Sequence, residues 1–338
     1  MLRYLIRRLG QALLVVAGVV VLTFAIMRLL PGDPAVAYAG PKATAAELAE
    51  VRARFGLDAP LPVQLWEYVR DLLSGDLGTS LHTRQPVLDD LMLAFPASLE
   101  LVGAALLVAV VLGIPLGIVA ARYKMRFLDF SVRIGGMLAV SVPVFWLALT
   151  AQTVFASNLG WFPVAGEYDA SLDTTSPLTV YTNITIVDSL ITGNWPMFTD
   201  TLHHLVLPAL VVAAYPMGVI AQLTRAALIE ESGLDHARMA RALGFGESAV
   251  LTRFSLRPVL NPVLALVALV FAYAIVNGFL VEAVFNWPGL GRYAADSIRA
   301  LDTPAIAGVT LLVALLYVLA NLVVDLVQGV VDPRARVR

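Results

Sequence analysis

Cysteine is missing from this sequence, and charged residues are scarce. The 338 residues include no cysteine, and only 14% of them are charged, whereas 59% are hydrophobic. Without cysteine the chain has no disulfide, no thiolate metal ligand and no cysteine nucleophile. Because a soluble domain carries about 25% charged residues, this shortage of charge predicts an integral membrane protein.

Motifs for metal and nucleotide chemistry are also missing. The four histidines, at positions 82, 203, 204 and 236, do not have a metal-ligand spacing such as His-Glu-x-x-His. The glycine-containing stretches 75–80 and 244–248 lack the lysine of a Gly-x-x-x-x-Gly-Lys-[Ser/Thr] phosphate loop. We therefore expect this chain to have no catalytic residue, no metal and no cofactor of its own. Any ATP-driven work must then come from another polypeptide.

Six apolar stretches are long enough to cross about 30 Å of hydrocarbon. None of the six contains a charged residue. They cover residues 9–27, 101–121, 134–156, 205–224, 259–281 and 303–324. The first follows a basic start, as a signal peptide does, but it is too long for one and has no small-residue cleavage site. We interpret it as a retained helix and predict an all-α membrane protein with six transmembrane helices.

The positions of the basic residues predict how these helices are oriented. Of 23 Lys and Arg, 15 fall on the side that holds both termini and residues 225–257, which predicts that this side is cytoplasmic. The loop 157–201 has no Lys or Arg and carries five carboxylates. We therefore expect residues 31–96, 157–201 and 286–302 to lie outside.

Three parts follow from this topology. Residues 1–30 form the N-terminus and the first span, residues 31–96 an outer cap, and residues 97–338 the transmembrane core. Helical spacing over residues 42–55 and 63–73 predicts that the cap is helical. Within the outer loop, residues 167–195 are expected to form a surface hairpin or an interfacial segment.

A polar segment between two apolar stretches, residues 225–257, predicts a short cytoplasmic helix. The Ser-x-x-Asp sequence at 232–235 is a start signal and Gly244 a stop signal, which leaves about nine residues, roughly 13 Å of helix. Ala237, Ala240 and Gly244 share one face that is nearly bare of side chains, so another backbone could come close there. A solvated loop anchored by arginines is the alternative.

The order of residues in this segment resembles the cytoplasmic loop of ABC-importer permeases. Ala240, Gly244 and Leu256 match that loop, and Arg238 and Arg257 depart from it in the way that the peptide/nickel branch does. In that family the loop contains the coupling helix, which sits in a groove of a separate ATPase. The resemblance thus implies a coupling role for Asp235, Ala237, Arg238, Ala240, Arg241, Ala242, Gly244 and Phe245.

Further motifs resemble the same family in the same order along the chain. The most specific is Glu282-x-x-Phe285-x-x-Pro288-Gly289-Leu290-Gly291. Others lie at residues 31–34, 56–64, 75–87, 160–166, 302–304 and 325–334. The resemblance covers nearly the whole chain, with residues 167–195 as the main gap, and it implies the type I importer permease fold.

This resemblance implies a bacterial inner-membrane subunit that forms half of a pathway for di- or oligopeptides; nickel or oligosaccharide import is the alternative. The implied partners are a second homologous permease chain, two ATP-binding subunits that hold ATP and Mg, and an extracytoplasmic substrate-binding protein. The chain would contact membrane lipid and no nucleic acid.

Two other classes of function have less support. An ion-coupled secondary transporter usually has ionisable groups within its spans, and an intramembrane enzyme needs a catalytic motif, but the six stretches contain neither. The polar residues that could line a pathway are Gln152, Thr153, Gln222, Asn277 and Asn321, and hydrogen bonding between helices is the alternative role for them. His203 and His204 are interpreted as interfacial polar residues rather than metal ligands.

Overall fold

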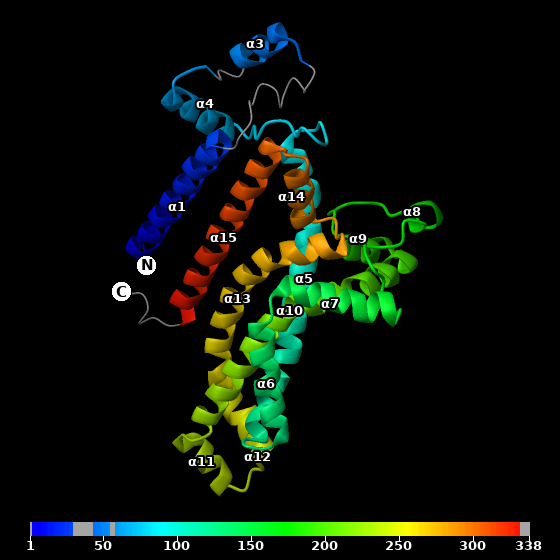
Figure 1. The fold of residues 1–338 in the computed structure, drawn as a ribbon. Coiled ribbons are helices and arrows are strands. Elements are labelled where there is room, and N and C mark those ends of the chain that lie inside the picture. Colours follow the sequence, from blue (N-terminus) through cyan, green and yellow to red (C-terminus); the bar gives the residue numbers. More distant parts are fainter. Residues whose placement is uncertain (1, 30–42, 55–57, 332–338) are drawn as a thin grey trace. The chain divides into compact units, whose positions relative to one another are not determined.

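The computed structural model describes residues 2–29, 43–54 and 58–331, which are mostly helical (Figure 1). The α-helices are α1 (Leu2–Leu29), α3 (Ala45–Arg54), α4 (Leu61–Leu73), α5 (Val87–Arg122), α6 (Phe127–Ser141), α7 (Val144–Ala151), α8 (Leu172–Thr175), α9 (Thr185–Thr192), α10 (Trp195–Glu231), α11 (Asp235–Ala242), α12 (Glu247–Ala249), α13 (Leu256–Phe285), α14 (Leu290–Arg299) and α15 (Thr303–Val331). Two π-helices, η1 (Gln152–Asn158) and η2 (Val250–Ser255), complete the set. Within the described ranges no strand forms beyond an isolated bridge between Thr79 and Pro86, which confirms the predicted all-α class.

Five of the described helices are long and apolar enough to cross a membrane. They are α5, α10, α15 up to Leu322, α1 from Arg7 to Ala25, and the continuous helical segment from Glu247 to Phe285. A sixth span exists if α6 and the helix from Val144 to Asn158 count as one bent element. The structure therefore agrees with five predicted spans and changes the shape of the third.

The third span is broken in its middle. The helices on either side of the break differ in direction by 107°, so the prediction of one continuous helix over residues 134–156 is wrong. At the break Val142 has extended angles, φ −86° and ψ 127°, and Pro143 precedes α7. Proline disfavours the helical conformation of the residue before it and offers no N–H to the helix.

The chain divides into two compact units. Unit 1 comprises residues 1–94 and 293–319, and unit 2 comprises residues 95–292 and 320–338. In unit 1, α3 and α4 occupy the segments of the first long loop where helical spacing was found. Their location outside the membrane stays a prediction. Motif residues 31–34, 56–57 and 332–334 lie outside the described ranges.

A buried carboxylate connects two distant motifs within unit 1. The Ser80 hydroxyl donates to the Asp302 carboxylate over 2.5 Å, and the His82 N–H donates to it over 3.0 Å. The same carboxylate accepts the Ala305 N–H, so Asp302 also caps the start of α15. The motifs at 75–87 and 302–304 therefore form one structural element.

Unit 2 packs around α10, which contacts α6, α7, α9 and α13. Glycines on the neighbouring helices allow a close approach. A Cβ on Gly117 of α5 would lie 2.6 Å from the Thr224 Cβ, and one on Gly136 of α6 would lie 2.5 Å from the Gln222 amide nitrogen. Close helix packing through small residues is the usual way in which membrane helices associate.

The loop of unit 2 between η1 and α10, predicted to lie outside, contains short helices and no hairpin. Residues 167–195 contain α8 and α9, so the hairpin interpretation is wrong; the interfacial one is untested. The Glu100 carboxylate on α5 accepts the N–H groups of Thr185 and Ile186, at the start of α9. Because it satisfies two N–H groups that have no helical partner, Glu100 stabilises a helix that the sequence pattern does not reveal.

Candidate functional site

The segment between α10 and α13 contains the predicted short helix, α11, which has eight residues. Gly244 follows it with φ +86°, in the left-handed region that favours glycine. The Gly244 N–H donates to the Arg241 carbonyl, and the Phe245 N–H donates to the Ala240 carbonyl. This is a Schellman ending, and it confirms Gly244 as the stop signal.

The predicted start signal is wrong. Ser232 ends α10, and its hydroxyl donates to the Ile229 carbonyl rather than capping α11. Leu234 precedes α11 without a side-chain cap. Asp235 lies in the first turn, where a negative charge is favourable near the helix N-terminus.

The face of α11 that has small side chains is filled by the same chain. Ala237 and Ala240 are buried in a cluster with Val250, and Phe254 packs against that cluster. The expectation that this face lies open to a partner is therefore wrong. The small side chains instead allow η2 to pack closely on α11, and the sequence alone does not say whose backbone makes such an approach.

Arg241 fixes the loop internally. Its guanidinium donates to the Glu247 carboxylate over 2.9 and 2.7 Å, and to the Ser232 carbonyl over 2.7 Å. The hydrogen bonds to Glu247 raise the pKa of Arg241 above its ordinary value. One side chain thus connects the end of α10, α11 and α12, a role different from direct contact with a partner.

The rest of the α11 surface is exposed and carries both apolar and charged side chains. Met239 is 66% exposed and Leu243 is 69% exposed, and Leu234 and Phe245 lie near them in the chain and are also exposed. We call these four residues the loop face. Arg238, Asp235 and Ala242 are exposed beside it. An apolar patch rimmed by charge is typical of an interaction site.

Met239 and Leu243 were not among the predicted coupling residues, although their spacing of four places them on one side of a helix.

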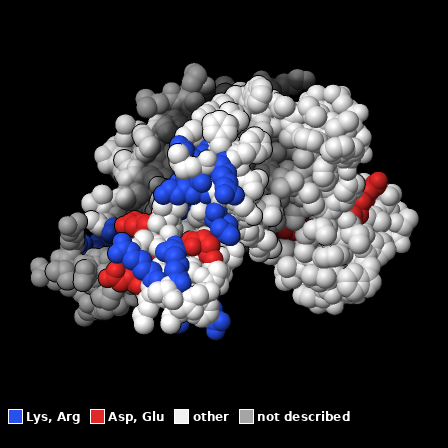
Figure 2. Space-filling model, turned by 90° about the horizontal axis from the view of Figure 1, so that it is seen from below, with Lys and Arg blue, Asp and Glu red and all other residues white. Residues whose placement is uncertain are grey.

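Figure 2 looks onto the end of unit 2 that carries α11 and α12, and shows Lys and Arg side chains gathered there with acidic ones between them. Of the eight predicted coupling residues, five are exposed, Arg241 is half-buried, and Ala237 and Ala240 are buried. The exposed five are Asp235, Arg238, Ala242, Gly244 and Phe245.

The Pro288-Gly289 motif forms a densely packed turn at the end of α13. The buried Glu282 carboxylate accepts the Gly291 N–H over 2.6 Å, and the Trp287 indole N–H donates to the Ala97 carbonyl over 2.9 Å. The Leu290 N–H donates to the Ser98 hydroxyl over 2.8 Å. These bonds hold the turn against both α5 and α13.

Three of the polar residues proposed to line a pathway make hydrogen bonds to backbone carbonyls within the chain. The Gln152 amide donates to the carbonyls of Val164 and Val284, so it holds the outer loop to α13. Thr153 and Asn277 bond to carbonyls four residues earlier in their own helices. Gln222 lies against Gly136. A pathway role for these residues and for Asn321 stays a prediction.

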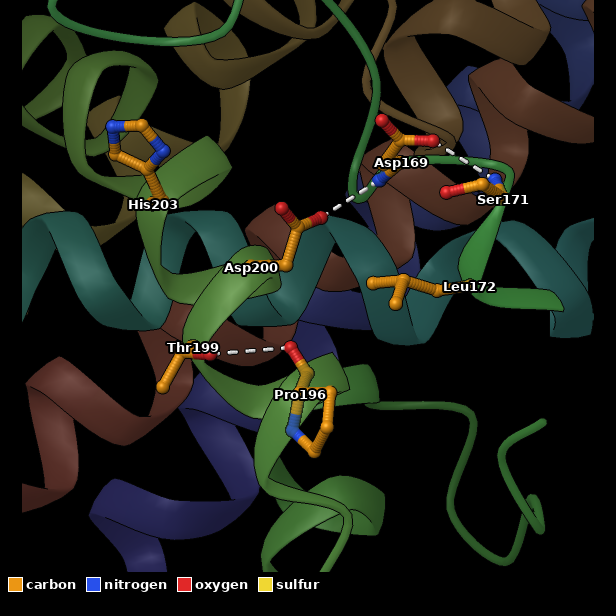
Figure 3. A pocket seen from close by; sticks show the side chains of 7 residues that line it. All are labelled: Asp169, Ser171, Leu172, Pro196, Thr199, Asp200 and His203. Atoms are coloured by element: carbon orange, nitrogen blue, oxygen red, sulfur yellow. Dashed lines mark hydrogen bonds between the residues drawn. The ribbon is translucent and has the colours of Figure 1, made fainter. Parts of the chain in front are cut away.

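An open cavity of about 560 Å³ lies between the outer loop and the start of α10 (Figure 3). The Asp169 N–H donates to the Asp200 carboxylate over 2.7 Å, and the Ser171 N–H donates to the Asp169 carboxylate over 2.9 Å. These hydrogen bonds join the loop side of the cavity to the start of α10 and stabilise its shape. The residues that line the cavity are Asp169, Ser171, Leu172, Pro196, Thr199, Asp200 and His203.

Both neighbouring histidines make contacts within the chain. The His203 ring lies 2.9 Å from the Trp161 carbonyl oxygen, and His204 lies 3.3 Å from the Asp200 carboxylate. Among the residues that the structure describes, no three His, Asp or Glu side chains are grouped to hold a metal ion.

Comparison with known proteins covers nearly the whole chain. The family described as "Binding-protein-dependent transport system inner membrane component" matches residues 113–337, and its N-terminal counterpart matches residues 1–102. The "Probable D,D-dipeptide transport system permease protein DdpB" of Escherichia coli is 43% identical over 328 residues, 97% of this chain and 96% of the relative.

Two further relatives extend this similarity. The "Di/tripeptide transport system permease protein DppB" of Pseudomonas aeruginosa is 38% identical over 337 residues, 99% of each chain. The "Dipeptide transport system permease protein DppB" of Alkalihalophilus pseudofirmus is 36% identical over 336 residues, 99% of this chain and all of the relative. Together with the apolar helices, these matches confirm the predicted resemblance: the chain belongs to the inner-membrane components of binding-protein-dependent transport systems and is a multi-pass membrane protein.

Proposed function

We propose that this chain is a permease subunit of an ATP-driven importer and forms half of a translocation pathway for di- or oligopeptides. The support for peptides is the full-length similarity to relatives that are named for D,D-dipeptides, dipeptides and di/tripeptides. An extracytoplasmic binding protein delivers the peptide in this proposal, as the family description implies.

The energy-coupling part of this proposal rests on the loop face, because these four residues lie on a segment that internal contacts hold rigid. The chain has no phosphate loop, so ATP must be hydrolysed by another polypeptide. Leu234, Met239, Leu243 and Phe245 offer that partner an exposed apolar surface. Burying such side chains at an interface is favourable, at roughly 25 cal/mol per Å² of apolar area.

The loop is built to transmit a push from such a partner. Arg241 connects α11 to the last turn of α10 and to α12, and the buried alanines pack α11 on η2. η2 continues directly into α13. A displacement of α11 therefore reaches two membrane helices through short, packed contacts rather than through a loose loop.

The full assembly in this proposal has a second homologous permease chain and two ATP-binding subunits, which hold ATP and Mg. The loop face and both termini lie in the cytoplasm of a bacterial cell, because 15 of 23 basic residues lie on that side. The outer loops face the binding protein.

Uptake of a labelled dipeptide by cells that depend on this chain tests the proposal. We expect uptake to stop when the partner ATPase gene is deleted and to return when it is restored. Uptake that survives this deletion but stops when the proton gradient is collapsed would indicate a secondary transporter. Uptake of nickel instead of peptide would overturn the substrate assignment alone.

A further inference from the structure

The turn between α5 and α6 combines exposed basic and exposed apolar side chains. All residues from 122 to 128 are exposed. Arg122, Lys124 and Arg126 alternate with Tyr123, Met125 and Phe127, and Met125 is 83% exposed and Phe127 79% exposed. We call residues 122–127 the basic turn. Large apolar side chains this exposed, next to cations, are not expected to face bulk water alone.

A buried ion pair between Arg225 and Asp129 fixes the shape of the basic turn. Met125 has φ +63°, an unusual value for a side chain of this size, and its N–H donates to the Asp129 carboxylate over 2.9 Å. Arg225 of α10 donates to the same carboxylate with two nitrogens, one of them over 2.8 Å. The turn is therefore preformed rather than loose.

The ion pair also leaves the basic turn with unbalanced positive charge. Asp129 is the one acidic residue between positions 122 and 133, and Arg225 already pairs with it. Arg122 donates to the Ser248 hydroxyl. Lys124 and Arg126 have no acidic partner within 4.0 Å among the described residues. The unpaired charges of Lys124 and Arg126 therefore favour binding of a negatively charged partner.

The apolar part of the turn continues into the surfaces of two membrane helices. On α5, exposed side chains recur at Leu112, Leu116, Val119 and Tyr123, and on α6 they recur at Phe127, Phe130, Ile134 and Met137. Both series have helical spacing. Since the turn follows directly on the apolar stretch 101–121, it lies at the depth where hydrocarbon gives way to lipid headgroups.

We propose that the basic turn binds the headgroups of anionic phospholipids in the cytoplasmic leaflet. Lys124 and Arg126 contact the phosphate groups, while Met125 and Phe127 insert among the first carbons of the acyl chains. Basic clusters beside a transmembrane helix attract anionic lipid. The assignment uses the predicted orientation, but it does not depend on the substrate or on the ATPase partner.

The test is lipid retention by the assembled transporter, purified with its partner subunits in neutral detergent. Micelles containing phosphatidylglycerol or phosphatidylcholine with the same acyl chains are added, and the bound lipids are counted by native mass spectrometry. We expect the wild type to prefer phosphatidylglycerol. The double variant Lys124→Gln/Arg126→Gln should retain at least about tenfold less of it.

The matched control is Arg70→Gln/Arg299→Gln, which removes two exposed cations far from the turn in sequence and should retain the lipid normally. Phe127→Ser should reduce retention of both lipids. Wild-type retention of phosphatidylglycerol by the Lys124→Gln/Arg126→Gln variant would overturn the proposal. So would loss of the ATP-hydrolysing subunit from that variant with lipid retention unchanged, because the turn would then be a protein-docking surface.

Discussion

Two kinds of glycine support this structure. Gly244 is required by its backbone, because φ +86° strains any residue that has a Cβ. Gly289 and Gly291 are required by space. A Cβ on Gly289 would lie 2.6 Å from the Ser98 hydroxyl, and one on Gly291 would lie 2.7 Å from the Phe279 carbonyl carbon. Neither Gly289 nor Gly291 has positive φ, so their backbone angles do not require glycine.

Gly244→Val tests the residue that ends α11. Strain on the order of 1–2 kcal/mol is expected at this position, although a Cβ there would meet no other atom within 4 Å. The loop face should distort while all spans insert normally. We expect weaker co-purification of the ATP-hydrolysing subunits and less peptide uptake from equal amounts of membrane-inserted chain.

Gly246→Val is the matched control, because Gly246 has φ −67° and open space around it. It should retain near wild-type uptake. Equal loss in both variants would show that bulk in this loop, rather than the left-handed backbone of Gly244, causes the defect.

At the scale of helices, apolar runs predict where spans lie but not how they bend. Pro143 breaks the third span, yet Pro96, Pro115, Pro208 and Pro216 lie inside α5 and α10 without ending them. Neighbouring helices can satisfy the carbonyl groups that a proline leaves free. The sequence contains each proline, but the packing that decides its effect lies elsewhere in the chain.

The same limit explains the partial success at α11. Its length and its stop at Gly244 follow from local backbone chemistry and were predicted. The burial of Ala240 against Phe254 and the pairing of Arg241 with Glu247 depend on how the following segment folds back. A bare helical face indicates close packing without identifying the neighbour.

The pair Arg241–Glu247 offers a prediction at this scale. Each side chain is about one-third exposed, so the pair contributes only roughly 0.2–1 kcal/mol to stability. We expect Arg241→Glu to leave insertion intact but to reduce peptide uptake, because two like charges replace the ion pair that joins α11 to α12. The double variant Arg241→Glu/Glu247→Arg should recover part of the uptake in a double-mutant cycle. Additive losses would argue against a shared structural role.

For the whole molecule, the orientation in the membrane is the assumption on which both proposals rest. The absence of native cysteine makes it directly measurable. A cysteine at the exposed Asp173 should react with an impermeant thiol reagent added to spheroplasts. A cysteine at Asp235, also exposed, should react only after lysis. Labelling of the cysteine at position 235 in spheroplasts, and of the one at position 173 only after lysis, would show that the topology is the reverse of the predicted one.

The central claim is that the loop face receives force from an ATP-hydrolysing partner. Leu243→Asp places a charge on that face, at a side chain that is 69% exposed. A buried unpaired carboxylate at an interface costs several kcal/mol. Leu73→Asp, at the end of α4 and at a site 85% exposed, is the matched control.

The most direct measurement is co-purification of the ATP-hydrolysing subunits with each variant, together with dipeptide uptake by the same cells. We predict that Leu243→Asp loses most of both, with the amount of inserted chain unchanged, and that Leu73→Asp resembles the wild type. Wild-type co-purification and uptake in Leu243→Asp would contradict the account, because the loop face would then not be the coupling surface.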